Sequence, residues 1–195
     1  MSASMLIAFL LSTTVAVGFE NLVANGDFNS HVAYFDLRFA HSGDVMDWDA
    51  EDSDGNPSSG SMAITEADGS GAIFGSQCIP VLGGNEYHFG GDMKIQTGTG
   101  ATKILLQQFS SIDCSTGFIS NFSDISIAVG MWTPADEVAL FDPNANSVWL
   151  GGWFDNYTSS PATAKFDNIS LYSETVIFFD HFEYGDLLQW DQWVP

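Results

Sequence analysis

The chain has 195 residues, and its 45% of hydrophobic residues supplies enough apolar surface for one domain with a core of its own. Its 25 Asp and Glu residues face four Lys and Arg residues, for a formal net charge of -21. This charge disfavours a nucleic acid partner or an anionic membrane surface, because both need basic side chains that the sequence nearly lacks. Divalent cations, neutral ligands such as sugars, and solubility in salt all fit the acidity.

The first 18 residues have the pattern of a secretory signal peptide. An apolar run over residues 5–17 is followed by a small residue, Gly18, that suits cleavage. The run is too short to cross a bilayer, and no later segment is long enough. We therefore predict a signal peptide over 1–18 and a secreted or extracytoplasmic protein without membrane insertion. The alternative is that this run forms a buried first strand.

Residues 19–173 predict strands rather than helices. Nowhere do apolar residues recur at helical spacing over three turns with caps at both ends. The stretch 87–95 instead alternates along a strand, with Tyr87, Phe89, Met93 and Ile95 on one face and His88, Asp92 and Lys94 on the other. Similar runs, separated by Gly, Asp, Asn, Ser and Pro, occupy residues 62–65, 72–80, 103–109, 125–131, 147–154 and 164–172. About eight to ten such strands favour an all-β fold, an antiparallel β-sandwich of jelly-roll type.

The polar stretch 44–61 is expected to be a long surface loop anchored by Trp48. Its acidic residues do not fit the EF-hand pattern, because Ala50 and Ser61 occupy the first and twelfth positions. We therefore predict that the acids are solvated. They are Asp47, Asp49, Glu51, Asp52 and Asp54.

The two cysteines of the chain, Cys78 and Cys114, predict one disulfide between two strands, because an even pair in an exported protein is most simply oxidised. Such a crosslink contributes roughly 3 to 4 kcal/mol on the chain-entropy model. The alternative is two buried thiols.

Aromatic residues in the second half of the chain are candidates for sugar binding, because aromatic faces stack on pyranose rings while amides bind hydroxyls. Trp149 and Trp153 share one face of a predicted strand, and Val148 and Leu150 point the opposite way. The alternative is that these tryptophans fill the core. The remaining candidates come from the next loop and from a neighbouring strand, and they are Asn156, Tyr157 and Trp132.

No catalytic centre is visible in the sequence. A Gly-x-Ser-x-Gly motif and a phosphate-binding glycine loop are both absent, and the acids are so abundant that a suitable carboxylate pair would arise by chance. The histidines also lack a zinc-binding spacing, and they are His31, His41, His88 and His181. We therefore predict a protein that is not an enzyme.

Several landmarks, in this order, resemble the galactose-binding-like jelly rolls that include carbohydrate-binding modules of families 4, 9 and 22. The segment NLVANGDFN at 21–29, with Trp48 after it, resembles the first strand of that family. The segment QCIPV at 77–81 and the turn at 83–85 are similar to its central strand and turn. Residues 143–150 and 166–171 look like its last two strands. The resemblance covers most of residues 20–172 and implies a jelly roll that binds a glycan.

The same resemblance implies a structural calcium ion near the first and last strands. Asn29 and Asp167 match the positions of two of its ligands, although the family usually has Glu in place of Asn29. Calcium prefers oxygen ligands of this kind. The alternative is that Asp167 only caps a strand and Asn29 is solvated.

Residues 174–195 form a separate tail of aromatic and acidic residues. The tail is similar to a short carboxy-terminal segment of secreted bacterial proteins, with the pattern F-x-D-x-F-E-x-G-D followed by Trp. The sequence as a whole therefore predicts a secreted module that binds a glycan by aromatic stacking. The first alternative is a surface or matrix protein whose tail mediates sorting or assembly, and the second is a small polysaccharide hydrolase.

Overall fold

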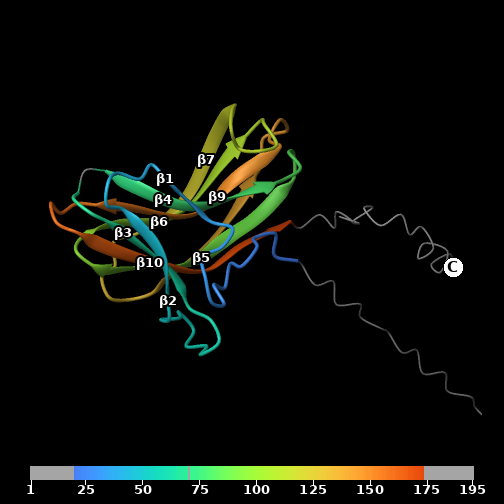
Figure 1. Cartoon of the computed structure of the whole chain (residues 1–195). Helices are drawn as coiled ribbons and strands as arrows, with labels where there is room; N and C mark the ends of the chain where they lie inside the picture. The colour runs from blue at the N-terminus through green and yellow to red at the C-terminus, as the bar shows by residue number, and fades with distance from the viewer. Residues whose placement is uncertain (1–19, 70, 174–195) are drawn as a thin grey trace, which may run out of the picture.

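The computed structural model describes residues 20–69 and 71–173, and within these ranges the chain forms strands and no helix (Figure 1). The signal peptide and the tail predicted from the sequence lie outside the described residues. No helix in the described part is long and apolar enough to span a membrane. The strands are β1 (Asp36–Arg38), β2 (Val45–Asp49), β3 (Ser61–Glu66), β4 (Ala72–Pro80), β5 (Glu86–Thr97), β6 (Gly100–Phe109), β7 (Phe118–Ser126), β8 (Thr133–Leu140), β9 (Ser147–Asn156) and β10 (Ala162–Ser173).

These strands build two five-stranded sheets that face each other as two layers (Figure 1). The first sheet has the order β1-β4-β9-β6-β7, and the second has the order β2-β3-β10-β5-β8. Every pairing between named strands is antiparallel. The predicted antiparallel β-sandwich of jelly-roll type is therefore confirmed.

The core lies between the sheets and follows the alternation of side chains along each strand. On β9 in the first sheet, Val148, Leu150 and Phe154 have no exposed surface. On β5 in the second sheet, the apolar residues of the predicted strand 87–95 are all buried. Because inward and outward positions alternate, the intervening residues of β9 must point away from the core.

The stretch 44–61 is not one loop, because its first part is strand β2, which pairs with β3. Trp48 packs against the core, and its indole N–H donates to the carbonyl of Phe28 at 2.7 Å. The outward positions of β2 include Asp47 and Asp49, and these acids led to the prediction of a polar loop. The true loop covers residues 50–60.

The strand predicted over 125–131 is also misplaced. Strand β7 ends at Ser126, and the apolar residues that follow it are exposed, with Ile127 at 74% and Met131 at 67%. The prediction was wrong because alternating apolar residues also occur in this exposed connection, where they form no strand. Within this connection, Val129 forms an isolated bridge with Ile95 of β5.

Cys78 and Cys114 form the predicted disulfide. It joins a strand to a loop rather than two strands, since Cys78 lies in β4 and Cys114 follows the end of β6. The backbone N–H of Cys114 donates to the hydroxyl of Ser147 at 3.1 Å, and Ser147 is the first residue of β9. The crosslinked loop is thus held against the start of β9.

Candidate functional site

Trp149 and Trp153 lie on the outer face of the first sheet and are partly buried. On neighbouring strands, Trp153 is paired with Phe74 of β4 and Lys103 of β6, so all three side chains share this face. The two tryptophans are four residues apart, a spacing of about 13 Å along a strand. Gly151, which has no side chain, lies between them on the same face.

A third ring, that of Phe39, bridges the two tryptophans. Its centroid lies 5.6 Å from that of Trp153 and 6.5 Å from that of Trp149, and Phe39 is 51% exposed. Phe39 directly follows β1, which reaches this face by pairing with β4. Phe39 was not among the predicted site residues, because nothing in the sequence around it indicates that it meets residues more than a hundred positions away.

Two of the four basic residues of the chain lie on the same face. Arg38 sits over the ring of Trp149 at 4.2 Å, and Lys103 lies 5.5 Å from the ring centroid of Trp153. Such cation–π contacts contribute about 0.5 to 1 kcal/mol at exposed sites. We call Phe39, Trp149, Trp153, Arg38 and Lys103 together the aromatic face. With four basic residues in the chain, each of them is conspicuous in the sequence, and this was the one sequence signal for Arg38 and Lys103.

Carboxylates and amides border the aromatic face. Asp155 accepts hydrogen bonds from Nζ of Lys103 at 3.0 Å and from the indole N–H of Trp153 at 2.9 Å, so it orients both side chains. Gln107 of β6 is paired with Trp149 and, on its other side, with Asn121 of β7. Both amides point to the outer face, where they are available to hydroxyl groups.

The structure does not bring Trp132 to this face. Trp132 precedes β8, and Nζ of Lys94 lies 4.7 Å from its ring centroid, on the outer side of the second sheet. The expectation that Trp132 contributes from a strand next to Trp149 and Trp153 is therefore wrong, because the strand order places β8 in the other layer.

Asn156 and Tyr157 lie where β9 ends, and they differ in accessibility. Asn156 is 6% exposed, and its amide N–H donates to Oε2 of Glu66 at 2.6 Å while its oxygen accepts from Thr158. Asn156 therefore stabilises the loop between β9 and β10. Tyr157 is 69% exposed, and only its backbone is anchored, to the carbonyl of Thr99 at 2.9 Å.

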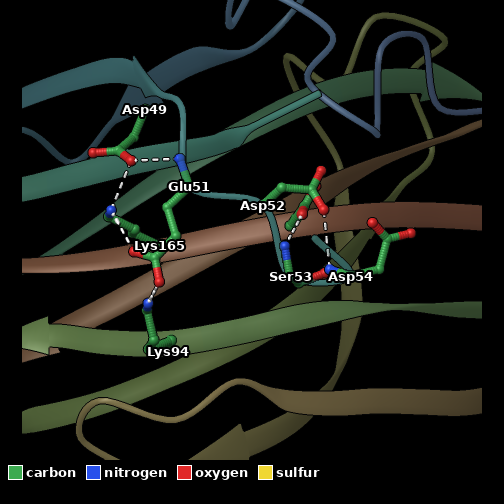
Figure 2. Close-up of polar contacts among 8 residues, drawn as sticks. Asp49, Glu51, Asp52, Ser53, Asp54, Lys94 and Lys165 are labelled. Carbon is green, nitrogen blue, oxygen red and sulfur yellow. Dashed lines mark hydrogen bonds and ion pairs between the residues drawn. The ribbon is translucent and has the colours of Figure 1, made fainter. Parts of the chain in front are cut away.

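On the outer side of the second sheet, two buried lysines correct the prediction of a solvated acidic loop (Figure 2). Lys165 is 5% exposed and lies 2.8 Å from the carboxylates of both Asp49 and Glu51. Lys94 is 3% exposed and also pairs with Glu51. The hydrogen bond from Lys165 and, to a smaller extent, the one from Lys94 lower the pKa of Glu51. These ion pairs fasten the 50–60 loop to the sheet.

Of the two residues predicted to hold calcium, Asp167 is buried and Asn29 is exposed. Asp167 has no exposed surface, and its two oxygens accept the backbone N–H groups of Ser53 and Asn168, each at 2.8 Å. Burial raises the pKa of Asp167 to about 6 despite these bonds. Asn29 is exposed, and its backbone N–H donates to Asn25 at 3.3 Å. Because no contact in the described ranges joins Asn29 to Asp167, calcium binding by this pair stays a prediction.

Comparison with solved structures gives the same fold at low sequence identity. The CBM22-1 xylan-binding domain of Xyn10C from Paenibacillus barcinonensis is 12% identical, with a TM-score of 0.57 over 82% of this chain and 97% of that one. A family 4 carbohydrate-binding module is 17% identical, with a TM-score of 0.56 over 78% of this chain and 99% of that one.

A larger protein shares the fold as well. The enzymatically active domain of tailspike protein 4 from bacteriophage CBA120 is 13% identical over 78% of this chain, with a TM-score of 0.63. This chain spans only 21% of that domain. No family model matches the sequence, and no curated protein matches it. The structural likenesses therefore establish the fold and leave the function to the site.

Proposed function

We propose that this protein is a secreted, non-catalytic carbohydrate-binding module that recognises a glycan on the aromatic face of its first sheet. The observation that carries the proposal is the gathering of Phe39, Trp149 and Trp153 on one outer face, with half of Phe39 exposed. Aromatic rings that gather on the outer face of a sheet and are partly open to solvent suit a binding surface.

The chemistry of this face suits a sugar. Aromatic rings present apolar surface to the C–H face of a pyranose, while nearby polar groups orient its hydroxyls. Gln107 and Asn121 supply amides beside Trp149, and Asp155 supplies a carboxylate beside Trp153. The ring of Phe39 lies near both tryptophan rings, and three neighbouring rings suit a chain of linked sugars better than a single ring. Solved structures of the same fold include a xylan-binding domain, which supports sugars as the ligand class.

Secretion is part of the proposal and has separate support. The apolar run in 1–18 has the pattern of a signal peptide. The disulfide between Cys78 and Cys114 is typical of an oxidising compartment, because thiols in the cytosol are kept reduced. Expression with and without residues 1–18, followed by fractionation, tests this part independently of binding.

The test of binding is retention on a panel of insoluble polysaccharides and on a glycan array. We expect the wild type to be retained by at least one glycan, and Phe39→Ala to reduce its affinity about tenfold or more, equivalent to about 1.4 kcal/mol. Trp132→Ala is the matched control, since it removes an aromatic ring from the opposite sheet. Circular dichroism and thermal unfolding check that each variant is folded. Lack of retention on every glycan, or equal losses in both variants, would refute the proposal.

A further inference from the structure

Three side chains with metal-binding groups meet at one end of the sandwich, apart from the aromatic face. His41 lies in the loop between β1 and β2, Asp44 immediately precedes β2, and Glu66 is the last residue of β3. One ligand atom from each lies within 4.8 Å of the other two, and no other group of this kind occurs among residues 20–69 and 71–173. The pairing of β2 with β3 in the second sheet thus brings residues of the loop before β2 close to the end of β3.

The two carboxylates of this group are withdrawn from solvent. The side chain of Asp44 has no exposed surface, and neither does Glu66. Hydrogen bonds fix the orientation of Asp44, whose oxygens accept the backbone N–H of His41 at 2.6 Å and that of Ala67 at 2.9 Å. Glu66 is held by the backbone N–H of Gly69 at 2.6 Å. Secondary hydrogen bonds of this type hold metal ligands in position.

Oε2 of Glu66 also accepts the amide N–H of Asn156 at 2.6 Å, so this carboxylate is held from β9 as well as from its own loop. At the cluster, the ring of His41 contributes a nitrogen 3.8 Å from Oδ2 of Asp44. The side chain of His41 is 48% exposed, so its ring can be reached from solvent.

We propose that His41, Asp44 and Glu66 bind one divalent transition-metal ion of the zinc class. An imidazole nitrogen with two carboxylates matches the ligand preference of Zn²⁺, whereas Ca²⁺ prefers oxygen ligands alone. In a tetrahedral Zn²⁺ site, ligand atoms about 2.0 to 2.2 Å from the ion lie about 3.3 to 3.6 Å from one another. The ligand atoms of the cluster lie within 4.8 Å of one another, so they would need to approach by up to about 1.5 Å to bind the ion. The bound ion would connect the loop between β1 and β2 to the end of β3.

The test is isothermal titration of the full chain with ZnCl₂, MnCl₂ and CaCl₂ after treatment with a chelator and its removal. We expect one Zn²⁺ per chain, bound more tightly than Mn²⁺ or Ca²⁺. His41→Ala should weaken zinc affinity about 100-fold, because it removes a direct ligand where even secondary partners contribute 10- to 100-fold. His41→Gln, which keeps a polar side chain of similar reach, should weaken zinc binding as well.

His31→Ala is the matched control, since His31 is another loop histidine, exposed and outside the cluster. It should bind zinc as the wild type does. Circular dichroism verifies that each variant is folded. Three results would overturn the assignment: no zinc uptake by the wild type, unchanged affinity in the His41 variants, or an equal loss in His31→Ala. The first would leave His41 and Asp44 as an ion pair only.

Discussion

Replacing Asp167 by Asn should change the pH dependence of stability in a direction set by burial. The carboxyl of Asp167 has no exposed surface, and its pKa is raised from an ordinary value of 3.8 to about 6. A raised carboxyl pKa means that folding favours the protonated form. The fold therefore loses stability as the pH rises from about 4 to about 6, where the unfolded chain is already ionised.

The size of the effect follows from the shift. The pKa of Asp167 is raised by about two units, and each unit corresponds to about 1.36 kcal/mol. Ionisation of this carboxyl should therefore lower the unfolding free energy of the wild type by about 3 kcal/mol. Asn stays neutral throughout, but it keeps only one oxygen to accept the N–H groups of Ser53 and Asn168, at a cost of about 1 kcal/mol. Between pH 4 and pH 7, stability should therefore shift by about 3 kcal/mol in favour of Asp167→Asn over the wild type.

Urea unfolding at pH 4, 5, 6 and 7 in a chelator measures this difference, and the chelator prevents a bound cation from holding Asp167 ionised. Asp136→Asn is the control, because Asp136 is exposed on β8, and its stability relative to the wild type should stay nearly constant. A constant difference for Asp167→Asn, or one that moves against Asn, would refute the argument from burial.

Three further predictions concern the disulfide, the buried lysines and calcium. Replacing both Cys78 and Cys114 by Ser should lower the unfolding free energy by about 4 kcal/mol, since the two residues are 36 positions apart; a loss below about 1 kcal/mol in chemical denaturation would contradict this. Lys165→Ala should destabilise by about 2 to 3 kcal/mol, because it leaves two acids without the buried ammonium that they share. Lys103→Ala should cost less than about 1 kcal/mol, because the side chain of Lys103 is more exposed than that of Lys165 and pairs with one acid only. Urea unfolding ranks the two variants, and the reverse order would be inconsistent with burial. Calcium should raise the unfolding temperature of the wild type but not that of Asp167→Asn in differential scanning calorimetry, and equal responses would count against a site at Asp167.

The strands that the sequence predicted are those with clear alternation. Strand β4 has the bounds expected from residues 72–80, and β9 includes the whole of 147–154. Strand β2 was missed because its outward positions are acidic, and β8 because its inward residues, Ala135 and Ala139, are too small to make a marked pattern. Period-two patterns thus predict strands only where one face is strongly apolar.

The sequence could predict only those parts of the candidate site that lie within one strand. Trp149 and Trp153 belong to one strand, so alternation alone indicates that they share a face. Phe39 and Lys103 reach the same face through pairings of β1 with β4 and of β6 with β9, which depend on the order of strands in the sheet. Strand order depends on contacts between distant segments and was not visible in the sequence.

The most direct test of glycan binding on the aromatic face is a titration with the retained oligosaccharide, followed by proton–nitrogen NMR of the indole N–H groups. We predict that the signals of Trp149 and Trp153 shift as the sugar binds, while those of Trp48 and Trp132 stay in place. Shifts confined to Trp132, or binding that leaves both β9 tryptophans unaffected, would contradict the account.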